Sequence, residues 1–178
     1  MSHQKEFVDL NKSTHDRASF DCKEPELNTF IRTLASKHMK SGISKTQVLP
    51  ATISLPTNLV PIFSFFTVAG STIKRESLPH AEGKKFPVYP VPVFLIAQMA
   101  VHDTYQGQGL GQITLIQALK YLLNVNEFMP SYAVVVDCLN GDAEKFYLKF
   151  GFVELCKHNG RTRLYLPMKA VIKLFGES

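Results

Sequence analysis

The stretch Tyr105-Gln106-Gly107-Gln108-Gly109-Leu110-Gly111, residues 105–111, decides the fold class of this 178-residue chain. It follows an apolar run at 93–101, typical of a strand buried on both faces, and precedes a helical repeat of apolar residues at 115–122. Glycine permits positive φ angles and close approach to a ligand, and a helix N-terminus adds about half a positive charge. This order predicts an α/β fold with a phosphate-binding turn, although such glycines are also typical of a tight connector without a ligand.

The spacing of these glycines excludes two common phosphate loops. A nucleoside triphosphate loop has a lysine directly after its last glycine, and no lysine follows Gly111. A dinucleotide-binding loop has the spacing Gly-x-Gly-x-x-Gly, whereas the glycines here follow Gly-x-Gly-x-Gly. If the turn holds a phosphate, the phosphate therefore belongs to another class of ligand.

The remaining sequence predicts a single mixed α/β domain over residues 1–178. Helices and strands are assigned from the spacing of apolar residues, and Asn159-Gly160 is a strong hairpin signal. A long proline-rich connection at 70–92 is of a kind that is usually functional or mobile. The other predicted elements are a helix at 24–39, strands at 47–55, 60–68 and 93–101, a helix after 111, a strand at 132–138, a helix at 142–150, and strands at 152–155 and 163–166.

Composition excludes several protein classes. A net charge of +5, from 20 Lys and Arg against 15 Asp and Glu, and 45% hydrophobic residues are those of a globular protein, not of a disordered or fibrous one. The longest apolar stretches, 59–70 and 91–101, are shorter than the ~20 residues that cross a bilayer. The polar N-terminus lacks a signal-peptide pattern, which predicts a cytoplasmic protein. Cys22, Cys138 and Cys156 are widely spaced, as expected for reduced thiols and not for a metal site.

Two motifs carry a resemblance to a known family. Gln106-x-x-Gly109-x-Gly111 is similar to the pyrophosphate-binding signature of the GNAT superfamily of N-acetyltransferases, Gln/Arg-x-x-Gly-x-Gly/Ala. The stretch Asn140-x-x-Ala143-x-x-Phe146-Tyr147-x-x-Phe150-Gly151-Phe152 resembles the second acetyl-CoA contact region of that superfamily. The resemblance covers most of the chain and is weakest before Glu24. It implies a GNAT fold, with a mixed central sheet of six to seven strands splayed at its middle and flanked by helices, and acetyl-CoA as cofactor.

The resemblance also implies where the cofactor binds. In the superfamily the pantetheine arm pairs with a strand edge, here at 98–101, where that strand diverges from its neighbour at 132–138. The diphosphate would lie on the amides of the glycine-rich turn. The cofactor contacts implied are Met99, Ala100, Val101, Gln106, Gly107, Gln108, Gly109, Leu110, Gly111, Asn140, Ala143 and Phe146.

Tyr147 is the catalytic residue that the resemblance implies. A tyrosine hydroxyl, with a pKa of about 10, stays protonated at neutral pH and can donate a proton to the departing thiolate. The alternative is that Tyr147 only packs in the core, at the margin of an inward stripe that contains Phe146 and Phe150. Strand 93–101 has no carboxylate to act as a general base. This favours an α-amine acceptor, pKa about 7.8, over a lysine amine, pKa about 10.4.

Within the superfamily the chain looks most like the acetyltransferase toxins of bacterial toxin-antitoxin systems. The matching residues are Phe20-Asp21-Cys22, Leu27-Asn28-x-Phe30-Ile31, Leu78-Pro79, Pro90-Val91-Pro92 and the glycine-rich turn. The resemblance implies aminoacyl-tRNA as acceptor, a block of translation and a ribbon-helix-helix antitoxin as partner. It implies no membrane partner, and it is compatible with a homodimer.

An uncompensated basic stretch bears on the acceptor. Residues 27–75 contain no Asp or Glu. Cations that converge around a cleft would bind tRNA phosphates, and scattered cations would be an ordinary solvated surface. The predicted acceptor-side residues are Arg32, Lys37, Lys40 and Arg75. Two other functions stay open: acetylation of a small amine or a protein N-terminus, and a non-catalytic domain that binds acetyl-CoA or a partner.

Overall fold

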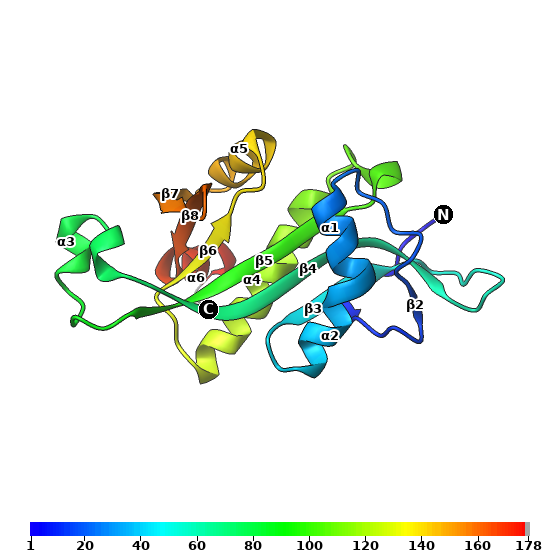
Figure 1. The fold of residues 1–178 in the computed structure, drawn as a ribbon, viewed down its shortest axis with the longest axis horizontal. Helices are drawn as coiled ribbons and strands as arrows, with labels where there is room; N and C mark the ends of the chain where they lie inside the picture. The colour runs from blue at the N-terminus through cyan, green and yellow to red at the C-terminus, as the bar shows by residue number, and fades with distance from the viewer. Residues whose placement is uncertain (177–178) are drawn as a thin grey trace. The chain divides into compact units, whose positions relative to one another are not determined.

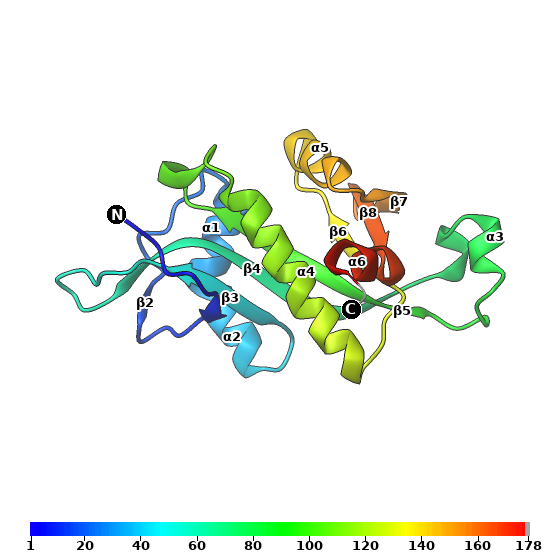
Figure 2. The ribbon, with the colours of Figure 1, turned by 180° about the vertical axis from the view of Figure 1, so that it is seen from behind.

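The strands of the protein form one mixed sheet. The computed structural model describes residues 1–176. Its eight strands have the order β1-β3-β4-β5-β6-β8-β7, and β2 pairs with β4 off this path (Figure 1). Helices flank the sheet, as the reverse view in Figure 2 also shows. The predicted mixed α/β class is confirmed, with eight strands where six to seven were predicted.

The chain forms two compact units. The first contains residues 1–69 and 97–118, and the second contains residues 70–96 and those from 119 on, so β4, β5 and α4 contribute to both. The elements are β1 Val8–Asp9, β2 His15–Asp16, α1 Pro25–Thr29, the π-helical turn η1 Phe30–Leu34, α2 Ala35–Lys40, β3 Lys45–Pro50, β4 Val60–Ile73, the 3-10 turn η2 Arg75–Ser77, α3 His80–Gly83, β5 Val91–Val101, the 3-10 turn η3 Asp103–Tyr105, α4 Leu110–Phe128, β6 Ala133–Asp137, α5 Gly141–Lys149, β7 Val153–His158, β8 Arg161–Pro167 and α6 Met168–Phe175.

The first unit packs a helical segment against a small sheet. Strand β3 pairs antiparallel with β1 and β4, and β2 pairs parallel with β4. Phe20 and Phe65 meet edge to face in the core, 5.3 Å between ring centroids. The predicted helix at 24–39 is found at 25–40, interrupted by η1. Within this segment Thr33 Oγ1 donates to the Thr29 carbonyl at 2.7 Å, a contact that commonly bends helices.

In the second unit, the sheet continues through β6, β8 and β7. Strand β5 pairs parallel with β6 at residues 94–96, and β8 pairs antiparallel with both β6 and β7. The predicted hairpin turn is present, with φ angles of 51° at Asn159 and 77° at Gly160. Helix α6 then buries Met168 and Val171.

Several predicted boundaries are wrong. Strand β3 ends at Pro50 and not at 55, because the register shifts at Leu49/Pro50 and proline donates no ladder hydrogen bond. Strand β4 continues to Ile73, so the connection shortens to 74–90 and contains η2 and α3. The sequence analysis missed β1, β2 and α6, since elements this short show too few periods of their apolar pattern. The expected divergence of residues 98–101 from β6 involves both units and stays a prediction.

Candidate active site

The glycine-rich turn joins the end of β5 to the start of α4 in the first unit (Figure 1). Gly107 and Gly109 have φ angles of 75° and 84°, in the left-handed region that favours glycine. A Cβ at either position would meet no atom within 4 Å, so the space beside this backbone is open. Gly111 lies inside α4, whose 19 residues begin at Leu110. The turn therefore presents exposed backbone at a helix N-terminus, an arrangement suited to a phosphate.

The turn is fixed by contacts on its protein side. The Gln106 side-chain amide donates to the Val101 carbonyl at 2.9 Å and to the Cys22 carbonyl at 3.2 Å. The Tyr105 ring stacks on Phe63, with ring centroids 3.7 Å apart and planes within 12°. The Gln106 side chain thus ties the turn to the segment that precedes α1, and a cofactor contact from this residue would come from its backbone.

Charged side chains beside the turn form ion pairs with one another. Lys23 Nζ lies 3.0 Å from Asp21 Oδ2 and 3.2 Å from Asp103 Oδ2, and Lys23 itself has a left-handed φ of 68°. The hydrogen bond from Lys23 is the main cause that lowers the pKa of Asp103. His102 Nδ1 lies 3.0 Å from Asp103 Oδ1. The Asp103 carboxylate is therefore a poor proton acceptor, which fits a structural role for it.

Tyr147 lies on α5 in the second unit. Asn140 Oδ1 accepts from the Ala143 amide at 2.9 Å and so caps the start of this helix. The sequence prediction that Tyr147 lies at the margin of the inward stripe is wrong: Tyr147 is only 8% exposed, and Phe146 is half-buried. The reason is packing beyond the helix, since the Tyr147 ring contacts Phe152 edge to face at 5.4 Å between centroids.

The Tyr147 hydroxyl keeps its proton. Burial, and to a smaller degree the neighbouring Cys138, raise the pKa of Tyr147 above its usual value near 10. No residue among 1–176 makes a hydrogen bond to this hydroxyl. It can therefore donate to a ligand at any physiological pH.

An ion pair that the sequence analysis missed fixes the end of β6, just before the loop that leads to α5. Arg163 Nε and Nη2 donate to the two Asp137 carboxylate oxygens, each at 2.7 Å, and the Arg163 side chain is buried. The Cys138 amide donates to the Thr162 carbonyl at 2.9 Å. The loop that contains Asn140 therefore starts from a fixed point on β6.

Three of the four predicted acceptor-side cations meet around one cavity. This cavity lies in the first unit and has a volume of about 450 Å³, and no acidic residue among the described residues 1–176 lines it. Arg17 Nη1 donates to the Arg32 carbonyl at 3.2 Å, which joins the N-terminal segment to η1. We call the lining residues the basic pocket: Lys12, Arg17, Arg32, Thr33, Ser36, Lys37 and Lys40.

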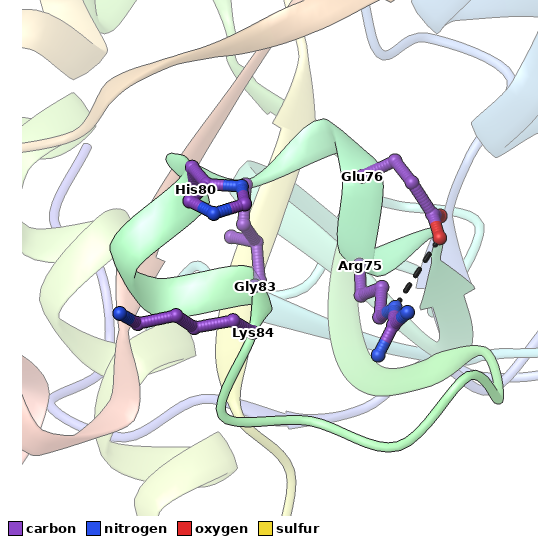
Figure 3. A pocket seen from close by; sticks show the side chains of 6 residues that line it. Arg75, Glu76, His80, Gly83 and Lys84 are labelled. Atoms are coloured by element: carbon purple, nitrogen blue, oxygen red, sulfur yellow. Dashed lines mark hydrogen bonds and ion pairs between the residues drawn. The ribbon is translucent and has the colours of Figure 1, made fainter.

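The remaining predicted acceptor-side residue, Arg75, lies in the second unit, where it lines another cavity (Figure 3). Lys12 and Arg17 were missed because they precede the acid-free stretch and show no periodic pattern that links them to α2. The predicted cofactor contacts are divided in the same way between the units. Residues 99–111 lie in the first unit, and Asn140, Ala143 and Phe146 lie in the second.

Within residues 1–176, no group of three or more His, Cys, Asp and Glu side chains is arranged to hold a metal ion. Over the same range, no helix is both long and apolar enough to cross a membrane.

Comparison with known proteins finds acetyltransferases that are similar to this chain. Residues 72–154 match the family described as acetyltransferase (GNAT) domain. A protein of Mycobacterium tuberculosis (strain ATCC 25618 / H37Rv) named tRNA-acetylating toxin is 27% identical over 137 residues, which cover 77% of this chain and 78% of that protein.

Solved structures match nearly the whole chain. A mutant of KacT superposes with a TM-score of 0.87 at 25% identity, covering 96% of this chain and 98% of that one. AtaT complexed with acetyl-methionyl-tRNAfMet superposes with a TM-score of 0.84, also at 25% identity, covering 96% and 99% of the two chains. The predicted GNAT fold and the resemblance to acetyltransferase toxins are therefore confirmed.

We expect Gly109→Ala to weaken acetyl-CoA binding about ten-fold, because an L side chain at this positive φ costs about 1–2 kcal/mol and the turn must relax away from its open shape. Isothermal titration with acetyl-CoA measures the change. Gly70→Ala is the matched control, since Gly70 has no positive φ and a Cβ there also meets no atom within 4 Å. Equal affinities of the two variants would contradict this role of the turn.

Proposed function

We propose that this chain, which carries a GNAT acetyltransferase domain, transfers the acetyl group of acetyl-CoA to the α-amine of an aminoacyl-tRNA and so blocks translation. The observation that carries the proposal is a basic pocket free of acidic residues on a fold that matches AtaT, a protein solved with acetyl-methionyl-tRNA. A small-amine acetyltransferase has no need of such a pocket. We also propose that residues 1–178 form a single catalytic domain.

Residues of the glycine-rich turn fit the diphosphate of acetyl-CoA. Gly107 and Gly109 hold the backbone open, and the start of α4 adds its partial positive charge. Met99 to Val101 would offer the end of β5 to the pantetheine arm. When bound, acetyl-CoA supplies a thioester that an amine can attack, with release of a thiolate that takes up a proton.

Tyr147 is the proton donor in this proposal. The Tyr147 side chain is buried and the pKa of its hydroxyl is raised, so Oη holds the proton until a developing negative charge approaches. Asn140, as the cap of α5, and the Asp137–Arg163 ion pair fix the elements on either side of the loop that leads to this helix.

The acceptor amine needs little help to lose its own proton. The end of β5 contributes no carboxylate, and the nearby Asp103 is paired with Lys23. An α-amine with a pKa of about 7.8 is already neutral in roughly a tenth of molecules at pH 7, whereas a lysine amine is neutral in far fewer. The site therefore suits an aminoacyl ester better than a lysine side chain.

The proposal extends to a partner and a location. A mutant AtaT toxin of the same fold is bound to the C-terminus of the antitoxin AtaR. We propose a ribbon-helix-helix antitoxin that binds and silences this chain. Because its acceptor is tRNA, the enzyme would act in the cytoplasm. The sequence is also compatible with a homodimer.

A comparison of acceptors tests the function. We expect the purified protein to release free thiol from acetyl-CoA with aminoacyl-tRNA, and to release little with deacylated tRNA, spermidine or a lysine-containing peptide. A thiol-reactive dye follows the rate. Turnover of spermidine or peptide without turnover of aminoacyl-tRNA would replace the proposal with a small-amine or protein acetyltransferase.

We expect Tyr147→Phe to lower kcat by about 10²–10⁴-fold, the usual contribution of a general acid, and to leave the KM for aminoacyl-tRNA nearly unchanged. Thiol release under single-turnover conditions measures this. Since Phe keeps the ring that packs on Phe152, the variant should unfold at the same temperature and bind acetyl-CoA normally. A full rate in the variant would leave Tyr147 as a core residue only.

For the basic pocket, we expect Lys37→Gln to raise the KM for aminoacyl-tRNA and to reduce the salt dependence of tRNA binding by about one counterion. Filter binding at several salt concentrations gives the slope. The control is Lys5→Gln, which removes an exposed cation of the same unit that is not in the pocket. Identical slopes for both variants would remove Lys37 from the acceptor site.

A further inference from the structure

The connection between β4 and β5 is a folded arm and not a loose loop. We define the arm as residues 74–90, which contain η2 and α3 (Figure 1). Leu78 is 5% exposed and lies in one cluster with Ile73, Val91 and Tyr165, and Phe86 packs on the same cluster. The Phe86 ring meets Tyr132 edge to face, with centroids 4.8 Å apart. The arm is therefore anchored to β6 and β8 by its own apolar side chains.

One acidic side chain of the arm is turned inward. Glu82 Oε2 accepts hydrogen bonds from the hydroxyls of Tyr132, at 2.5 Å, and Tyr165, at 3.3 Å. Burial, and then the bond to Glu82, raise the pKa of Tyr132, so this tyrosine stays a donor. These two hydrogen bonds attach α3 to Tyr132 and Tyr165, in addition to the apolar contacts of the arm. They also hold the Glu82 carboxylate away from the surface of the arm.

The two turns of the arm are locked together. Gly83 is buried, and a Cβ there would come within 2.6 Å of the Arg75 carbonyl oxygen, so only glycine allows η2 and α3 to pack this closely. Arg75 Nη1 donates to the Phe86 carbonyl at 2.9 Å, which holds the guanidinium in place. The cations of the arm therefore sit on a fixed frame.

A cavity of about 380 Å³ opens on this frame (Figure 3). Arg75 and Glu76 line it from η2, His80 lines it from the start of α3, and Lys84 lines it directly after the end of α3. Because Glu82 points inward, Glu76 is the one carboxylate at the surface of residues 74–90. The Glu76 side chain is 66% exposed and its Oε1 lies 3.3 Å from Arg75 Nε. An ion pair this exposed to water is weak. Lys74 and Lys85, which are next to Arg75 and Lys84 in the sequence, are exposed cations as well.

We infer that the arm is a second RNA-binding surface, in which the cavity lined by Arg75, His80 and Lys84 takes a backbone phosphate of the acceptor tRNA. Cationic side chains around an exposed cavity can make the sequence-independent contacts to phosphates that nucleic-acid binding uses. The inward orientation of Glu82 favours phosphate binding, because an exposed carboxylate at the same place would repel the phosphate. The inference rests on the proposed function. It assigns to the arm a part of the tRNA that the basic pocket does not contact.

The experiment uses the double variant Lys84→Gln/Lys85→Gln in the full chain. Both side chains are exposed, so the fold should be unaffected. We expect the salt dependence of tRNA binding to fall by about one to two counterions and the KM for full-length aminoacyl-tRNA to rise, with kcat and the KM for acetyl-CoA unchanged. Lys169→Gln/Lys173→Gln on α6 is the control for lost charge in the same unit, and it should behave as wild type.

A second acceptor separates this inference from the proposed function. A short aminoacyl oligonucleotide with only the 3′ end of a tRNA should be acetylated equally well by wild type and by the arm variant. If wild type acetylates aminoacyl-tRNA and the arm variant binds it with an unchanged salt slope, the inference is wrong and the function stands. An equal loss with the short acceptor would also overturn it, because the effect would then lie in the catalytic centre.

Discussion

Positive φ angles at Gly107 and Gly109 are the constraint on which the proposed chemistry depends. They let the chain leave β5, run through an exposed turn and enter α4 with its first backbone amides open to a ligand. The protein side of the turn is closed by Gln106, whose amide reaches both Val101 and Cys22. The segment that precedes α1 is thereby attached to the turn, and the basic pocket and the glycine-rich turn belong to one packed unit.

Burial has different consequences for the Tyr147 hydroxyl and for the Glu82 carboxylate. For Tyr147, burial without a protein partner among the described residues keeps the hydroxyl protonated and free to donate. For Glu82, two tyrosine donors make an inward orientation stable, and the withdrawn charge leaves the surface of the arm positive. In both cases the surrounding side chains, and not the residue type alone, decide what the group can do.

Much of the candidate site could be predicted from local sequence. The glycine-rich turn, the helix with Tyr147 and the cations of η1 and α2 are each contained in short stretches, where motif spacing and helical periodicity are informative. The inward orientation of Tyr147 could not be predicted, because Phe152 lies beyond the helix and packs on it only after the turn at Gly151. Lys12 and Arg17 join the basic pocket, and Glu82 meets Tyr132 and Tyr165, through contacts between distant parts of the chain that no local pattern records.

In the proposed reaction the acceptor is the α-amine of an aminoacyl group on tRNA. The most direct test of this acceptor is mass spectrometry of the aminoacyl-adenosine released by nuclease digestion after charged tRNA is incubated with acetyl-CoA and the purified protein. We expect the mass of the aminoacyl-adenosine to increase by one acetyl group, about 42 Da, with wild type and to stay nearly unchanged with Tyr147→Phe. Unmodified aminoacyl-adenosine under conditions where the enzyme turns over another amine would contradict the proposed reaction.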